Sequence, residues 1–134
     1  MTMLPFKVID FIENVHVANT GEMINTKPNE FEIMQELKQH RDDIDDIDNQ
    51  IAELLGKRFR VAEEVAKLKE KYNIPVRIER RIDQVLENAE KNEEKHKLPP
   101  RLGYFLWREI IEATCYHEEV LLGYIDPNEE EEEF

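Results

Sequence analysis

The sequence lacks residue types that several classes of function require. It contains no serine, which excludes a Ser–His–Asp catalytic set. Its single cysteine, Cys115, excludes an internal disulfide, and neither a CxxC pair nor an HExxH motif supplies zinc ligands. We therefore expect no metal and no cofactor. The N-terminus lacks a basic region followed by an apolar run, and no apolar stretch is long enough to span a bilayer, so we expect a cytoplasmic protein.

Positive charge is scarce as well. The 134 residues include 31 acidic and 18 basic side chains, which gives a formal net charge of −13 at pH 7. Nucleic acids and anionic membranes both select basic proteins, so we expect neither as a partner. A small anionic ligand is compatible with this balance, because a few local cations can outweigh a distant acidic surface.

Helix breakers are nearly missing from the middle of the chain. Between Pro28 and Pro75 the only glycine is Gly56. This pattern predicts a helix of about 45 residues, roughly 65 Å long. A compact domain of this size is only about 35–40 Å across. The helix is too long for one such domain, so it requires a partner, most simply a second copy of the chain.

Two shorter helices are predicted after the long one. The second runs from Val76 to Lys95, and the third follows the "KLPPR" break and runs from Leu102 to Leu121. The predicted architecture is all-α, with one long helix and two shorter helices in an intertwined homodimer.

The composition divides the chain into three segments. Residues 1–28 form an N-terminal extension without an assigned role, with short strands predicted at "FKVIDFI" and "VHVAN". Residues 29–125 form the helical domain. Residues 126–134 contain five consecutive glutamates, which is typical of a solvated, disordered tail.

Cations interrupt one seam of the predicted long helix. This cation-bearing seam has the heptad a and d spacing and contains Arg41, Ile44, Asp48, Ile51, Leu55, Arg58, Ala62, Val65 and Lys69. A parallel apolar seam, predicted as ordinary core, contains Ile47, Leu54, Val61 and Leu68. A buried cation costs several kcal/mol unless it is paired or binds an anion. A single cation often extends its head to water, and Asp48 offers a partner. Three on one seam, with Arg81 from the next helix, favour an anion site.

The spacing of these cations predicts how they combine. Arg58 and Lys69 are eleven residues apart, about 16 Å along the helix axis, so both can bind one small ligand. Arg41 and Arg58 are seventeen residues apart, about 25 Å, which is too far for one small ligand. In an antiparallel dimer, Arg41 of one chain can approach Arg58 and Lys69 of the other. We therefore predict a cationic pocket between subunits that binds a small di-anion.

These residues lie within a longer motif. It consists of R-x-x-I-x-x-x-D-x-x-I at Arg41–Ile51, L-L-x-x-R at Leu54–Arg58, Lys69, "IPVR" at Ile74–Arg77, Arg81, and "EIIEAT" at Glu109–Thr114. The motif resembles the AroQ-class (type II) chorismate mutases, an all-α family of intertwined three-helix dimers. The resemblance covers residues 37–122.

The resemblance implies an isomerase of the shikimate pathway, in aromatic amino acid biosynthesis. Such enzymes convert chorismate to prephenate by a pericyclic rearrangement, holding a compact conformer and stabilising charge on the ether oxygen. It implies that Arg41 of the partner subunit, Arg58 and Arg81 bind carboxylates. Lys69 would donate to a carboxylate and the ether oxygen, and Thr114 would be a hydroxyl contact.

Three residues depart from the family pattern. Ile78 and Ile82 replace an Asp and a Glu, and the Glu ordinarily binds the ring hydroxyl of chorismate. Glu118 replaces a Gln that donates to the ether oxygen in bacterial members, although some eukaryotic members also have Glu. An ionised Glu118 would repel charge developing on that oxygen. Either burial favours the protonated form, or Glu118 pairs with Lys69 and weakens the site.

These departures leave four functions open. Chorismate mutase is the default. The two isoleucines suggest an isochorismate-pyruvate lyase, which forms salicylate and pyruvate on the same scaffold, because that family also resembles this chain in having an aliphatic residue there. A mutase for an amino or iso analogue of chorismate is a third hypothesis. A non-catalytic helical dimer module is the alternative from a different class.

Overall fold

The structure is a computed structural model that describes residues 29–131. The strands expected within residues 1–28 lie outside the described residues. The helices, in chain order, are α2 (Glu30–Lys71), α3 (Glu79–Lys95), α4 (Leu102–Leu121) and α5 (Pro127–Glu131). Residues 29–131 contain no strand, which confirms the all-α prediction. The short α5 lies in the segment expected to be a disordered tail.

The chain divides into two units, Met1–Asn49 and Gln50–Phe134, and the division falls within α2. In the first unit, the Asn29 side chain accepts a hydrogen bond from the backbone N–H of Glu32 at 2.8 Å and caps the start of α2. The apolar side chains of this unit are exposed at Phe31, Met34, Ile44 and Ile47.

Helices α2, α3 and α4 all end in the same backbone motif. The residue two positions past each helix has a positive φ, at Asn73, Lys97 and Gly123. At the end of α2, the backbone N–H of Ile74 donates to the carbonyl of Lys69 at 2.7 Å, and that of Asn73 donates to Glu70 at 3.2 Å. This Schellman pattern satisfies the last carbonyls and reverses the chain. It ends α2 at Lys71, four residues before Pro75.

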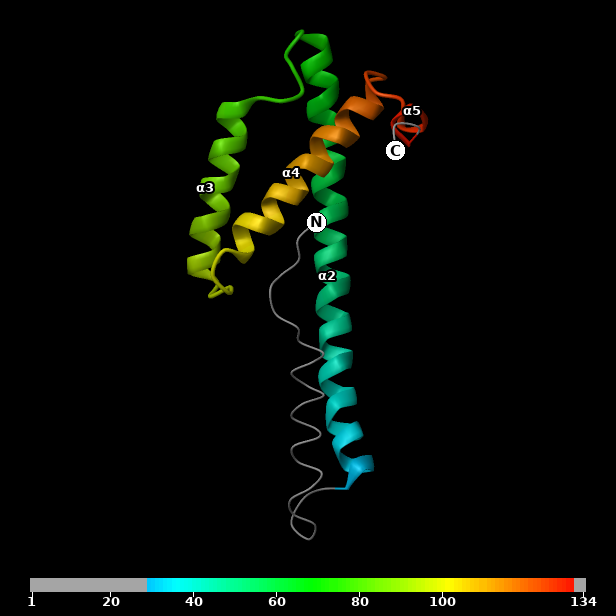
Figure 1. Cartoon of the computed structure of the whole chain (residues 1–134), viewed down its shortest axis with the longest axis vertical. Coiled ribbons are helices and arrows are strands. Elements are labelled where there is room, and N and C mark those ends of the chain that lie inside the picture. The colour runs from blue at the N-terminus through cyan, green and yellow to red at the C-terminus, as the bar shows by residue number, and fades with distance from the viewer. Residues whose placement is uncertain (1–28, 132–134) are drawn as a thin grey trace. The chain divides into compact units, whose positions relative to one another are not determined.

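Helices α3 and α4 pack against each other in the second unit (Figure 1). Their contact is close because Gly103 has no Cβ; an added Cβ would lie 2.8 Å from the Ala89 carbonyl oxygen. Glu93 of α3 accepts hydrogen bonds from the backbone N–H groups of Arg101 and Gly103 at 2.9 and 2.7 Å. A carboxylate at a helix N-terminus is favourable, so Glu93 caps α4 from the neighbouring helix.

The core of the second unit is small. Val76, Ile111 and Cys115 are buried together, and four partly buried residues pack around them: Ile82, Val85, Leu86 and Leu122. On α2 only Ala62 and Ala66 are buried. The predicted apolar seam is not core within one chain, because Leu54 and Val61 are 63% exposed and Leu68 is 52% exposed. None of the described helices is long and apolar enough to cross a membrane.

Candidate active site

A cavity of about 460 Å³ opens between α2, α3 and α4 in the second unit. Seven of the residues singled out from the sequence line it: Arg58, Lys69, Ile78, Arg81, Ile82, Thr114 and Glu118. The eighth, Arg41, belongs to the first unit and is not among the residues that line the cavity. The cavity is large enough for a ligand of metabolite size.

Helix α2 supplies Arg58 and Lys69, with the short side chains of Ala62 and Val65 lining the cavity between them. The Arg58 Nη1 donates to the hydroxyl of Thr114 on α4 at 3.0 Å. That hydroxyl donates in turn to the Ile110 carbonyl one turn earlier, at 2.6 Å. The hydroxyl therefore uses its one proton to donate to the backbone, and its oxygen accepts the hydrogen bond from Arg58. Thr114 thus orients the guanidinium.

Lys69 is held from two sides. Its Nζ donates to the backbone carbonyl of Val76 at 2.6 Å and to Oε1 of Glu118 at 3.0 Å. The Lys69 and Glu118 side chains are only 14% and 5% exposed. An ammonium group has three N–H bonds, so these two contacts within the described chain leave one for a ligand. Because the pair is buried, each partner needs the other to offset its loss of hydration.

The cavity carries excess positive charge although the whole chain is acidic. Arg58, Lys69 and Arg81 face one carboxylate, Glu118, so the charges lining the cavity leave an excess of two positive. The pKa of Arg58 lies below its ordinary value, first because burial disfavours the cation and then because Arg81 repels it; Glu118 opposes both effects. These cations repel one another within the cavity, so a bound anion would stabilise them.

The remaining wall of the cavity is apolar. Ile78, Ile82 and Val85 line it from the α3 side, and Ile111 and Cys115 line it from α4. Burial raises the pKa of the Cys115 thiol, which keeps it neutral and consistent with a packing role. The cavity therefore combines cationic groups with a largely aliphatic surface, on which the Cys115 thiol is the single polar side chain among the five residues named.

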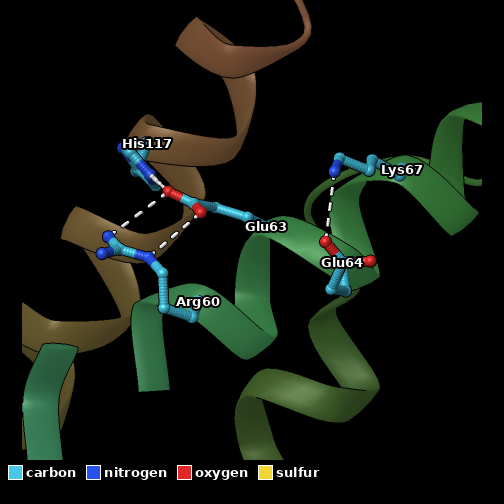
Figure 2. Close-up of polar contacts among 5 residues, drawn as sticks. All are labelled: Arg60, Glu63, Glu64, Lys67 and His117. Carbon is cyan, nitrogen blue, oxygen red and sulfur yellow. Dashed lines mark hydrogen bonds and ion pairs between the residues drawn. The ribbon is translucent and has the colours of Figure 1, made fainter. Parts of the chain in front are cut away.

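A cluster of polar contacts near the cavity also joins α2 to α4 (Figure 2). Glu63 lies between Arg60, whose Nε donates to it at 3.1 Å, and His117, whose Nε2 is 2.8 Å from its carboxylate. The hydrogen bond with His117 is the main reason why the pKa of Glu63 lies below its usual range. Glu63 follows Ala62, and His117 precedes Glu118, so the cluster connects segments that line the cavity.

Sequence reasoning missed three contributors to this arrangement. The Val76 carbonyl had no signal, because every residue carries one. The pair between Arg77 and Glu112 spans 35 residues, and that between Glu63 and His117 spans 54. No periodicity within one helix can connect residues at such separations. Among the described residues, no group of three or more His, Cys, Asp and Glu side chains is arranged to hold a metal ion.

Known proteins match the part of the chain that forms this cavity. The chorismate mutase type II family matches residues 40–119, and the chain belongs to that family. A bifunctional chorismate mutase/prephenate dehydratase from Aquifex aeolicus (strain VF5) is 32% identical over 98 residues, covering 70% of this chain and 27% of that protein. A chorismate mutase from Methanocaldococcus jannaschii is 28% identical over 80 residues, covering 60% of this chain and 81% of that protein.

A third relative is the T-protein of Enterobacter agglomerans, which is 33% identical over 82 residues, covering 61% of this chain. The chain spans only 27% and 22% of the lengths of the Aquifex and Enterobacter proteins. No solved structure matches the chain significantly.

Proposed function

We propose that this protein converts chorismate to prephenate. The observation that carries the proposal is the cavity in which Arg58, Lys69 and Arg81 gather against an aliphatic wall. Chorismate is a di-anion with a largely apolar ring. The cationic side chains can therefore bind its carboxylates, and the aliphatic wall can pack against its ring. The excess of two positive charges that one chain contributes favours the binding of a di-anion.

The rearrangement needs no nucleophile and no proton transfer, so the cavity acts through position and charge. Arg58 and Arg81 bind carboxylates and hold the enolpyruvyl group over the ring in a compact conformer. Arg58 is already oriented by Thr114 at 3.0 Å, which lowers the entropy lost on binding. The remaining N–H of Lys69 donates to the ether oxygen, where negative charge grows as the C–O bond breaks.

A second copy of the chain completes the proposed site. The apolar side chains Ile44, Ile47, Ile51 and Leu54 of α2 are each more than half exposed, and such a stripe is typical of an interface. Arg41 and Arg58 both lie on the heptad seam that contains Ile44 and Ile51. We propose a homodimer in which Arg41 of each chain binds a substrate carboxylate in the cavity of the other.

Isochorismate is the second candidate substrate. Ile78 and Ile82 line the cavity where a polar side chain would be needed to bind the ring hydroxyl of chorismate. A buried substrate hydroxyl without a partner loses affinity, so this wall favours a ring whose hydroxyl lies elsewhere. The product would then be salicylate and pyruvate rather than prephenate.

The test is to supply chorismate and isochorismate separately to the purified chain and to identify the products by chromatography. We expect prephenate from chorismate. In the Lys69→Ala variant we expect the rate to fall by roughly a hundredfold or more, the usual effect of removing one donor to a developing oxyanion. Salicylate from isochorismate alone would establish the second candidate. If the folded chain forms neither product, both candidate reactions are overturned and a non-catalytic helical dimer module is favoured.

A further inference from the structure

The segment between α2 and α3 is attached to α4 by a two-pronged ion pair. Arg77 donates to Glu112 from Nη2 at 2.6 Å and from Nη1 at 3.1 Å, and its Nε donates to Glu79 at 3.2 Å. Both Arg77 and Glu112 are about half exposed and lie outside the lining of the cavity. The proposed chemistry assigns them no role.

This pair is adjacent to the carbonyl that holds Lys69. Val76, whose carbonyl accepts from Lys69 Nζ at 2.6 Å, directly precedes Arg77. A peptide group is planar, so the Val76 carbonyl and the backbone N–H of Arg77 turn together, and the direction of the carbonyl changes with ψ of Val76 and φ of Arg77. The Val76 side chain is fixed by burial against Ile111 and Cys115. Apolar burial alone has no directional preference, whereas the contact from Arg77 to Glu112 has a defined geometry.

We infer that Arg77 and Glu112 are positioning residues, which fix the Val76 carbonyl and thereby aim the Lys69 ammonium into the cavity. The inference rests on the proposed function, because the value of aiming Lys69 comes from its contact with a substrate oxygen. Glu118 restrains the same ammonium from the α4 side at 3.0 Å. If the Val76 carbonyl turns away, only Glu118 still holds the Lys69 ammonium. The N–H bond that would reach the substrate then points in several directions.

A mutant cycle in the full-length chain tests the pairing. Arg77→Gln and Glu112→Gln should each lower kcat by about tenfold, because a misplacement near 1 Å can cost up to a hundredfold. KM should stay within about twofold, since the carboxylate-binding arginines are untouched. The double variant should be no slower than either single variant, because one contact is lost in all three. Arg77→Lys, which keeps the charge without the two-pronged geometry, should recover only part of the rate.

A matched control comes from another exposed ion pair, which lies within α2. Glu64 pairs with Lys67 at 3.1 Å, and Figure 2 shows this pair apart from the Glu63 cluster. Glu64→Gln removes the same charge as Glu112→Gln and should leave kcat and KM unchanged. A similar fall in kcat for Glu64→Gln, or additive effects of the two cycle variants, would overturn the positioning role.

A second measurement does not depend on catalysis. Reductive methylation of lysines, quantified by peptide mass spectrometry without substrate, reports how firmly the Lys69 ammonium is held. In Arg77→Gln the rate at Lys69 should rise at least about threefold relative to the exposed Lys57, because a group freed from a buried hydrogen bond becomes accessible. An unchanged rate would overturn the inference. A protein that fails to turn over chorismate but shows this rise would overturn the proposed function alone.

Discussion

Glu118 is the residue whose chemistry most directly limits the proposed reaction. It is 4% exposed and pairs with Lys69, so its carboxylate faces the group that must stabilise the ether oxygen. Gln at this position keeps an oxygen acceptor for Lys69 and adds an N–H donor. We therefore expect Glu118→Gln to raise kcat at neutral pH by roughly tenfold, within the range found for one oxyanion donor.

Steady-state kinetics of both proteins at one neutral pH measure this contrast. An unchanged or lower kcat for Glu118→Gln would contradict the role given to Glu118.

Glu112 gives a prediction about stability. Its hydrogen bond from Arg77 is the main reason why the pKa of Glu112 lies below its ordinary value near 4.5. A carboxyl with a lowered folded-state pKa stabilises the fold above the unfolded-state value, and this contribution is lost as the pH falls through the folded-state value. Urea unfolding should show Glu112→Gln slightly less stable than the unmodified protein near pH 7, with the difference shrinking as the pH falls below about 4.5. A constant difference would show that the ion pair is not its source.

At the scale of helices, the contact between α3 and α4 depends on Gly103. A Cβ there would lie 2.8 Å from the carbonyl oxygen of Ala89, a backbone atom that cannot move away by a side-chain rotation. The two helices would have to separate and weaken the Glu93 cap. We expect Gly103→Ala to lower the free energy of unfolding by about 1–3 kcal/mol, as overpacking commonly does.

Gly56 provides the control for that substitution. It lies within α2, and an added Cβ would meet nothing within 4 Å. Gly56→Ala should therefore raise the free energy of unfolding by about 0.5–1 kcal/mol, because alanine loses less backbone freedom in a helix. Thermal or urea unfolding of both variants measures the contrast, and equal effects would contradict the role given to Gly103.

The helices were largely predictable from the sequence, but their ends were less so. Scarcity of Gly and Pro after Pro28 predicted one long helix, and α2 begins at Glu30 as expected to within two residues. It ends at Lys71, shortly before Pro75 as expected, whereas α3 starts at Glu79, three residues after the predicted Val76. The difference at α3 has a tertiary reason: Val76 is buried and its carbonyl accepts a hydrogen bond from Lys69, and residues 76–78 are not helical.

The site was predictable in its residue types but not in its partners. Cations on an otherwise apolar seam identified Arg58 and Lys69, because local periodicity reports which side chains share a face. Their contacts with Thr114 and Glu118 span 56 and 49 residues, and periodicity carries no such information. Only the resemblance to a known family brought those two residues forward, and their catalytic roles stay predictions.

At the scale of the whole molecule, the exposed apolar side chains of α2 predict a dimer. Leu54 is 63% exposed in the single chain, and a charge placed there would be buried without a partner in the proposed interface. We expect Leu54→Glu to dissociate the dimer and to abolish most activity, since each site would lose Arg41 of its partner. Light scattering after size exclusion measures the mass. A monomeric unmodified protein with full activity would contradict the proposal.

The cavity described above, positive within an acidic chain, has a kinetic consequence. A di-anion approaching a chain with a net charge of −13 is repelled until it reaches the local excess of two positive charges. Added salt shortens the range of electrostatics to about 10 Å near 0.1 M, so it screens the distant repulsion before the close attraction. Moderate salt should therefore speed substrate association, measurable as a rise in kcat/KM, whereas proteins that steer their ligands are slowed by it. Substrate association should therefore be faster near physiological ionic strength than at low ionic strength.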